Sequence, residues 1–200
     1  QALHPTSYHD DLKYSIGEAA ARQGNGQPAT PPEALPATDA YTRVQDELRR
    51  SKLAADEETS LINPREKVEP IIELVDQAGK VFVCGLGDDG LIAREFAMRL
   101  SLLGLLTIHH ADPILMMSNL SAARRGDVLL MVSEFGKLPE ISQLSRQFQA
   151  CEGKVVSITR NTSNPLRAHA DASLVVSAHD PAPHVEHVLY RSSLQSLLDF

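Results

Sequence analysis

Short apolar runs alternate with helical patterns from residue 80 to the end of this chain of 200 residues. The unbroken apolar character of the runs indicates strands that are buried on both faces of a sheet. The expected strands lie at residues 81–84, 105–109, 128–132, 155–159 and 174–177, and the expected helices at 91–103, 113–124, 139–151, 165–169 and 185–200. Such alternation predicts an α/β fold in which a parallel five-stranded sheet forms the middle of three layers.

The residues before this region have a different character. Residues 24–36 are rich in proline, glycine and small side chains, which predicts a linker, and residues 8–21 before it have the pattern of a short amphipathic helix. After the linker, Thr38 and Asp39 are candidates to cap a helix that runs towards Leu61. Asn63 is the candidate cap of a further helix, with Pro64 in its first turn.

Charge and cysteine content exclude several classes of protein. The formal net charge is −7, so no basic excess is available for this chain alone to bind a phosphate backbone. No apolar stretch reaches the length of a membrane span, and no secretory leader is present. Cys84 and Cys151 lie far apart and lack metal-type spacing. We therefore expect a cytoplasmic protein without a metal or another cofactor.

Two loops that follow expected strands carry the candidate chemistry. The first has the sequence GLGDDG (residues 85–90), and the second has the sequence SEFGKLPE (residues 133–140). Open α/β sheets bind ligands at the carboxyl ends of their strands, where the amides of the next helix favour an anion. A lone G-x-G-x-x-G is weak evidence for a dinucleotide. The alternative is that these glycines permit a tight turn while Asp88 or Asp89 stabilises the start of the helix.

These loops, together with a third pattern at residues 157–171, resemble the sugar isomerase (SIS) domain in the form found in RpiR-type transcriptional regulators. Residues 85–90 align with that family's G-x-G-x-S-G loop, and residues 133–140 with its S-x-S-G-x-T-x-E loop. The resemblance implies a flavodoxin-like sheet, frequent dimerisation and a phosphosugar pocket at the strand ends. The ligand-binding residues that it implies are Gly87, Asp88, Asp89, Ser133, Glu134, Phe135, Gly136, Lys137 and Glu140.

The amino-terminal residues extend this resemblance. Leu12 and Lys13 look like the pair that opens the last helix of the family's helix-turn-helix domain. The resemblance therefore implies a DNA-binding domain whose recognition helix lies upstream of this chain. We expect three parts: a helix-turn-helix remnant with its linker at residues 1–37, a helical extension at 38–79, and an SIS domain at 80–200 that is truncated in its last helix.

The departures from the family pattern affect the phosphate-binding hydroxyls. Asp89 stands at the family's serine position, Phe135 replaces the second serine, and Leu138 replaces the threonine. Each lost hydrogen bond to a charged group is worth about 1.5–3 kcal/mol, so the usual phosphosugar mode is weakened by orders of magnitude. Lys137 and Arg160 are possible compensating charges, although a solvated loop residue is the simpler interpretation of Lys137. Phe135 could equally fill the space of the phosphate.

The remaining polar residues do not form a convincing catalytic or metal-binding set. His109 and His110 are adjacent on an expected strand and point to opposite faces. His184 and His187 share a face of the last helix, which indicates a helix surface or a dimer contact more than a zinc site. Glu140 could act as an acid or base in an isomerase, but it has no evident partner in the pattern.

Three hypotheses follow from the sequence. The preferred one is an effector-sensing and dimerisation domain of a DNA-binding regulator, which binds a sugar phosphate or sugar acid as a homodimer or higher homo-oligomer. The second is a phosphosugar isomerase on the same fold, which needs a positioned base and intact phosphate anchors. The third is a dimerisation module that binds no ligand, and burial of Phe135 and Leu138 in the pocket would favour it over the other two.

Overall fold

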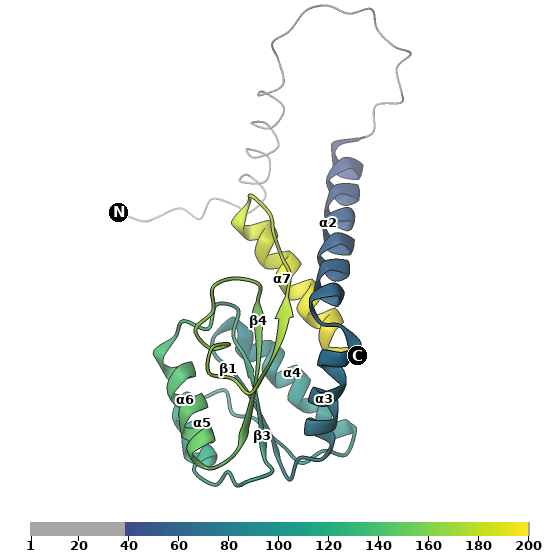
Figure 1. Cartoon of the computed structure of the whole chain (residues 1–200). Helices are drawn as coiled ribbons and strands as arrows, with labels where there is room; N and C mark the ends of the chain where they lie inside the picture. The colour runs from purple at the N-terminus through teal and green to yellow at the C-terminus, as the bar shows by residue number, and fades with distance from the viewer. Residues whose placement is uncertain (1–38, 200) are drawn as a thin grey trace, which may run out of the picture. The chain divides into compact units, whose positions relative to one another are not determined.

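The computed structural model describes residues 39–199, and Figure 1 shows the arrangement of their helices and strands. The predictions for residues 1–38 lie outside the described residues. They comprise the helix at 8–21, the linker at 24–36, the helix-turn-helix remnant and the cap at Thr38.

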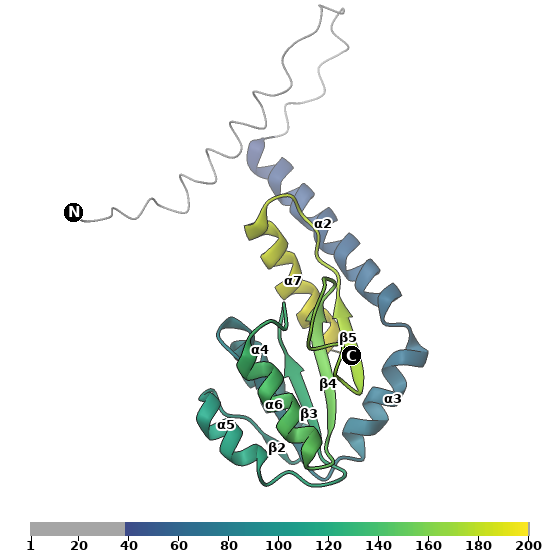
Figure 2. The same ribbon diagram turned by 60° about the vertical axis from the view of Figure 1, so that its left-hand side comes forward.

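A parallel five-stranded sheet forms the centre of the fold, as the sequence predicts (Figures 1 and 2). The strands run in the order β2-β1-β3-β4-β5, which is the flavodoxin-like order, and every neighbouring pair is parallel. Their bounds are β1 Val81–Gly85, β2 Thr107–Ile108, β3 Val128–Val132, β4 Lys154–Arg160 and β5 Ala172–Val176. The second strand is shorter than expected, because only two of its residues pair with β1.

Helices follow the strands in the expected alternation, with two further helices before the sheet. Their bounds are α2 Ala40–Ile62, α3 Arg65–Asp76, α4 Asp88–Leu102, α5 Pro113–Leu120, α6 Pro139–Ala150 and α7 Pro183–Leu198. The prediction of a helix at residues 165–169 is wrong, since this segment is a turn. Its start is held by Asn164, whose side-chain oxygen accepts a hydrogen bond from Leu166 N at 3.1 Å. A local bond of this kind competes with helix formation in so short a segment.

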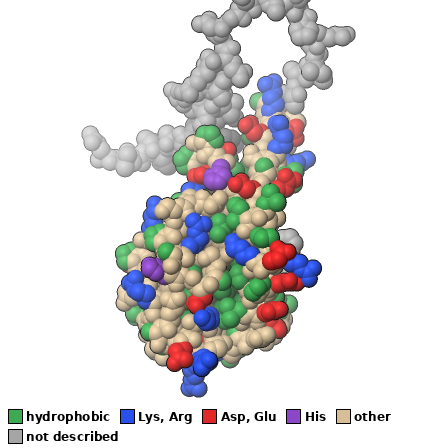
Figure 3. Space-filling model, viewed as in Figure 1, with side chains coloured by type: hydrophobic (Ala, Val, Ile, Leu, Met, Phe, Trp, Pro, Cys, Tyr) green, Lys and Arg blue, Asp and Glu red, His purple; other side chains and the backbone are tan. Residues whose placement is uncertain are grey.

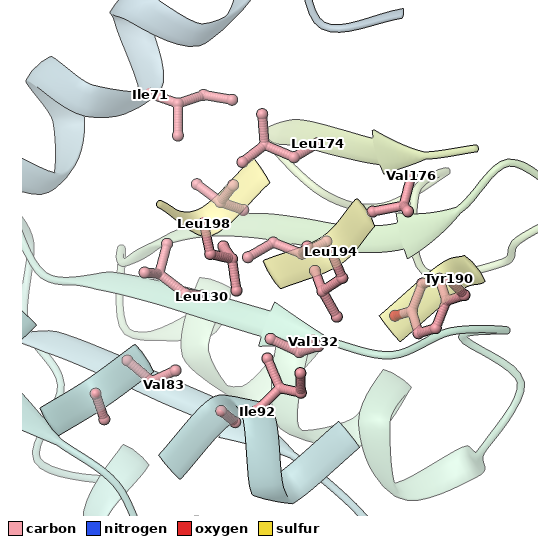
Figure 4. Packing of buried hydrophobic residues seen from close by; sticks show 14 of the residues in the cluster. Ile71, Val83, Ile92, Leu130, Val132, Leu174, Val176, Tyr190, Leu194 and Leu198 are labelled. Carbon is pink, nitrogen blue, oxygen red and sulfur yellow. The ribbon is translucent and has the colours of Figure 1, made fainter. Parts of the chain in front are cut away.

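Two hydrophobic clusters cover the two faces of the sheet. Because successive strand residues point to opposite faces, Val81 and Val83 belong to one cluster, and Phe82 and Cys84 to the other. The first cluster includes residues of α2, α3, α4 and α7, and the second includes residues of α5 and α6. Figure 4 shows the first cluster, in which side chains of α3, α4 and α7 meet those of the sheet. This packing confirms the three-layer prediction.

Asn63 has a different role from the predicted helix cap. The residue at the cap position of α3 is Pro64, which makes no side-chain capping bond. The buried Asn63 side chain instead binds both backbone groups of Val175, donating to its oxygen at 2.6 Å and accepting from its nitrogen at 2.9 Å. These bonds satisfy a backbone position on β5, the edge strand of the sheet. The corner between α2 and α3 is thereby fixed to the sheet.

Candidate functional site

The two predicted loops meet at the carboxyl edge of the sheet. They follow β1 and β3, which are neighbours in parallel register, with Gly85 paired to Val132. Gly87 occupies the cap position of α4 with a φ of 60°, and Asp88 and Asp89 form the first turn of that helix. The structure therefore agrees with the expectation that a tight turn places these two carboxylates at a helix start.

Asp89 connects the two loops directly. Its Oδ2 accepts a hydrogen bond of 2.9 Å from the backbone nitrogen of Glu134. The hydroxyl of the buried Tyr190 lies 3.5 Å from its other carboxylate oxygen. Burial raises the pKa of Asp89, and the neighbouring Asp88 adds to the rise, while the Glu134 amide, Arg191 and Tyr190 oppose it. A carboxylate thus stands where the family pattern has a serine hydroxyl.

Glu134 and Arg160 form a buried ion pair beside this connection. Arg160 Nη1 lies 3.2 Å from a carboxylate oxygen of Glu134 and 2.7 Å from one of Glu186 on α7. The Arg160 guanidinium also lies 4.7 Å from the ring centre of Phe135. Burial raises the pKa of Glu134, and the positive charge of Arg160 only partly counteracts this. The Arg160 charge is therefore already engaged by two carboxylates.

His187 on α7 lies between two carboxylates of the site. Its Nδ1 is 3.3 Å from Glu134 Oε2, and its Nε2 is 3.0 Å from Asp88 Oδ2. One turn further along α7, Arg191 Nη1 donates to the backbone oxygen of Asp88 at 2.8 Å and lies 3.2 Å from its carboxylate. The interpretation of His187 as a helix-surface residue is therefore incomplete, because it joins both loops. His184 is exposed, as expected for such a surface.

The contribution of α7 to the site was not predicted from the sequence. His187, Tyr190 and Arg191 contact the two loops from this helix. Glu186 contacts Arg160, the last residue of β4. Their spacing of three and four residues puts them on one face of a helix. That spacing was the available signal, although it does not show which part of the molecule the face contacts.

The other predicted residues of the second loop have separate roles. The buried Ser133 accepts a hydrogen bond of 3.2 Å from Gly136 N through its hydroxyl. Gly136 has a φ of 59°, and a Cβ there would overlap the side chain of Asn164, so this position requires glycine. Lys137 is exposed, with its Nζ 5.9 Å from the centre of the Phe135 ring. Glu140 is exposed in the first turn of α6.

Two residues that replace the family's hydroxyls remain at the surface. Phe135 is 42% exposed and Leu138 is 49% exposed. Burial of both residues in the pocket, which would favour a module that binds no ligand, is therefore not observed. Leu138 occupies the cap position of α6 without a side-chain capping bond, and Pro139 follows in the first turn, as predicted.

Residues 39–199 contain no helix that is both long and apolar enough to span a membrane. Within the same range, no group of three or more histidine, cysteine or acidic side chains is arranged to hold a metal ion. Cys84 is buried in the sheet, and burial raises the pKa of its thiol to about 12. Such a thiol is protonated at neutral pH and is a poor nucleophile.

Comparison with known proteins identifies the family. The family model of the SIS domain matches residues 74–197, which is more than half of the chain. The chain therefore belongs to the SIS domain family, which confirms this part of the resemblance. Its distant relatives include both regulators of the helix-turn-helix type and sugar-phosphate isomerases.

Three similar proteins illustrate this division. The chain is 26% identical over 171 residues to the uncharacterized HTH-type transcriptional regulator YfhH of Escherichia coli K12, covering 86% of this chain and 61% of the regulator. It is 29% identical over 151 residues to 3-hexulose-6-phosphate isomerase of Mycobacterium gastri, covering 76% of this chain and 69% of the isomerase. The Vibrio vulnificus NanR protein, solved in complex with ManNAc-6P, has a TM-score of 0.70 at 20% identity, over 94% of this chain and 65% of NanR. The chain thus spans less than two thirds of YfhH and of NanR, and the likeness to NanR shows the fold alone.

Proposed function

We propose that this chain is the effector-sensing and dimerisation part of a DNA-binding transcriptional regulator, which responds to a sugar phosphate or a related metabolite. The observation that carries the proposal is that one helix, α7, contacts both the candidate site and the helix that precedes the SIS domain. Near its start, α7 supplies His187 to the loops and Glu186 to Arg160 beside them. Near its end, Ser196 donates a hydrogen bond of 3.3 Å to Asp56 of α2.

This arrangement offers a route by which a ligand could act on the rest of the regulator. A ligand that enters between the loops must displace or reorganise the contacts of His187 and Arg191. The buried side chains of Leu194 and Leu198 pack in the same cluster as Ala55 of α2. A shift of α7 would therefore change the packing of α2. Coupling of this kind requires that the ligand bind the two positions of α7 with different affinity.

An apolar surface supports the dimerisation part of the proposal. A hollow of about 560 Å³ is lined mainly by apolar side chains of α3, α4 and the end of α7. Leu102 and Leu103, which line it, are 81% and 79% exposed, and Figure 3 shows apolar side chains at the surface between charged ones. Exposed apolar surface of this extent is typical of a protein interface. We assign this surface of α3, α4 and the end of α7 to the interface with a second copy of this chain.

The proposal is tested by calorimetry combined with sedimentation. The chain is titrated with ManNAc-6P, A5P, a sugar acid and the unphosphorylated sugars N-acetylmannosamine and glucosamine, and its oligomeric state is measured with and without each ligand. We expect saturable heat with at least one of them and a dimer that dissociates on Leu103→Asp. Leu53→Asp, which changes an exposed leucine of α2 outside the hollow, is the control. Absence of saturable heat with every ligand would remove the sensing function, and a monomer at all concentrations would remove the dimer.

The runner-up function is a phosphosugar isomerase, and one observation favours it. Glu134 carries a raised pKa and lies in contact with His187, which is the kind of pair that moves a proton between carbon and oxygen atoms. An assay of aldose–ketose conversion decides between the functions. Turnover that is lost in Glu134→Gln or in Glu140→Gln would make this protein an enzyme, and the two variants would identify the base.

A further inference from the structure

Two backbone amides of the second loop are occupied by side chains of the chain itself. Glu134 N donates to the Asp89 carboxylate at 2.9 Å, and Gly136 N donates to the Ser133 hydroxyl at 3.2 Å. Amides in a loop between a strand and a helix are the groups that normally bind the oxygen atoms of an anion. In this protein the anion that the Glu134 amide binds is the carboxylate of Asp89.

Two positive charges of the site, those of Arg160 and Arg191, are occupied in the same way, whereas Lys137 is exposed. The Arg160 guanidinium bridges Glu134 and Glu186, and Arg191 binds Asp88 through both its backbone oxygen and its carboxylate. Four carboxylates, those of Asp88, Asp89, Glu134 and Glu186, therefore face two guanidinium groups and the half-exposed His187. A phosphate placed here would meet an excess of negative charge in a partly buried setting, where screening is weak.

We propose that Asp89 is a built-in anion that takes the place of a ligand's phosphate, so that this site selects a sugar or amino sugar without a phosphate group. This inference rests on the proposed sensing function and narrows the class of its effector. Carboxylates accept hydrogen bonds and donate none, so they suit the hydroxyl and ammonium groups of such a ligand. Asp88 is available for these contacts, because 52% of its side chain is exposed. Phe135, which is 42% exposed, offers an apolar ring in the second loop.

The role of Asp89 is tested by exchanging it for residues that remove its charge in two ways. Asp89→Ser removes the carboxylate and frees the Glu134 amide, whereas Asp89→Asn removes the charge but keeps an oxygen that can accept from that amide. Calorimetry compares N-acetylmannosamine with its 6-phosphate, glucosamine with its 6-phosphate, and inorganic phosphate alone. Thermal unfolding followed by circular dichroism verifies that each variant is folded.

We expect the unmodified chain to bind the unphosphorylated member of a pair at least about tenfold more tightly than the phosphorylated one. In Asp89→Ser, affinity for the phosphorylated members and for phosphate should rise by about tenfold or more, because an amide donor to a charged group becomes available. The gain of phosphate affinity in Asp89→Asn should be smaller, since the asparagine side chain still accepts from the backbone amide of Glu134.

Two results would overturn the inference: tighter binding of the phosphorylated member by the unmodified chain, or no gain of phosphate affinity in Asp89→Ser. A third result separates this inference from the proposed function. If no sugar binds to the unmodified chain but Asp89→Ser gains phosphate affinity, the built-in anion is upheld and the sensing function is lost.

Discussion

The two edges of the sheet use acidic side chains in opposite ways. At the amino edge, Asp171 precedes β5 and accepts hydrogen bonds from Lys154 Nζ at 2.8 Å and from the backbone nitrogen of Val155 at 2.9 Å. Desolvation raises the pKa of Asp171. These two hydrogen bonds and a third from Gln149 outweigh that effect, so the pKa of Asp171 is lowered. At the carboxyl edge, burial dominates and raises the pKa of both Asp89 and Glu134.

This difference separates a structural edge from a candidate binding edge. Asp127 at the amino edge is buried, and its carboxylate accepts from Arg124 N at 2.9 Å, with Lys80 at 3.6 Å. Each carboxylate there is matched to donors of the same chain. The carboxyl edge instead holds carboxylates in excess of the positive groups that contact them. Groups that are unfavourable for folding commonly persist where a ligand is bound.

The comparison is tested most strongly by removing one positive charge from each edge. In Arg160→Met, the buried Glu134 and the adjacent Glu186 lose their partner, so the free energy of unfolding should fall by about 3–5 kcal/mol. In Lys154→Met, the loss should stay below about 1 kcal/mol, because the lysine side chain is 56% exposed. Urea unfolding of both variants measures the two losses. Equal losses would show that the two edges are built alike.

A pair of glycines at the two edges provides the second test. Gly136 and Gly126 both have positive φ values, 59° and 90°, but a Cβ at Gly126 meets no atom within 4 Å. Gly126→Ala should therefore cost only the backbone strain, about 1–2 kcal/mol. Gly136→Ala adds an overlap with Asn164 and should cost about 3 kcal/mol or more. Thermal unfolding of the two variants ranks them, and a smaller loss in Gly136→Ala would mean that the second loop is adaptable.

The fold was predictable because β1 and β3 are apolar over their whole length and β4 and β5 contain short apolar runs. Any sequence of alternating buried strands and helices has few ways to pack, and the order of the sheet follows from the family resemblance. The two wrong predictions have separate causes. Asn63 bonds to Val175, 112 positions away, and does not cap α3. At residues 165–169, the local bond from Leu166 N to the Asn164 side chain competes with a helix.

The candidate site was only half predictable for a related reason. Both loops were recognisable because glycine and polar residues follow buried strands, and this combination marks the ligand-binding edge of such sheets. The four residues of α7 lie about 50 positions beyond the second loop. Helical spacing puts Glu186 and Tyr190 on one face, but only the packing of α7 over the sheet shows that this face meets Asp89.

A matched exchange of aspartate for asparagine should change stability in opposite directions at the two edges. Asp171→Asn weakens charge-assisted bonds to Lys154 and Val155, so the free energy of unfolding should fall by about 1 kcal/mol. Asp89→Asn removes a partly buried charge but keeps an acceptor for the Glu134 amide, so stability at neutral pH should rise by less than about 1 kcal/mol. Urea unfolding at pH 7 measures both changes. A loss in Asp89→Asn as large as that in Asp171→Asn would contradict the contrast.

The smallest effect is expected in the pH dependence of stability. The pKa of folded Glu134 is raised above the usual 4.5, so the folded state binds its proton more tightly than the unfolded state does. Its contribution therefore makes the protein less stable as the pH rises from 4.5 through the raised pKa. Asp171, whose folded pKa lies below 3.8, contributes stability that is present above 3.8 and is lost as the pH falls through the folded pKa.

Variants at the two positions separate these contributions. Relative to the unmodified chain, Glu134→Gln should gain stability as the pH rises above 4.5, since it lacks the group that is harder to ionise when folded. Asp171→Asn should approach the stability of the unmodified chain only when the pH falls below 3.8, because Asp171 then loses its contribution to the free energy of unfolding. Melting temperatures measured between about pH 3 and pH 7 give both difference curves. Because Glu134 meets both Arg160 and His187, a flat curve for Glu134→Gln would mean that these partners offset its burial fully, and the carboxyl edge would then resemble the amino edge.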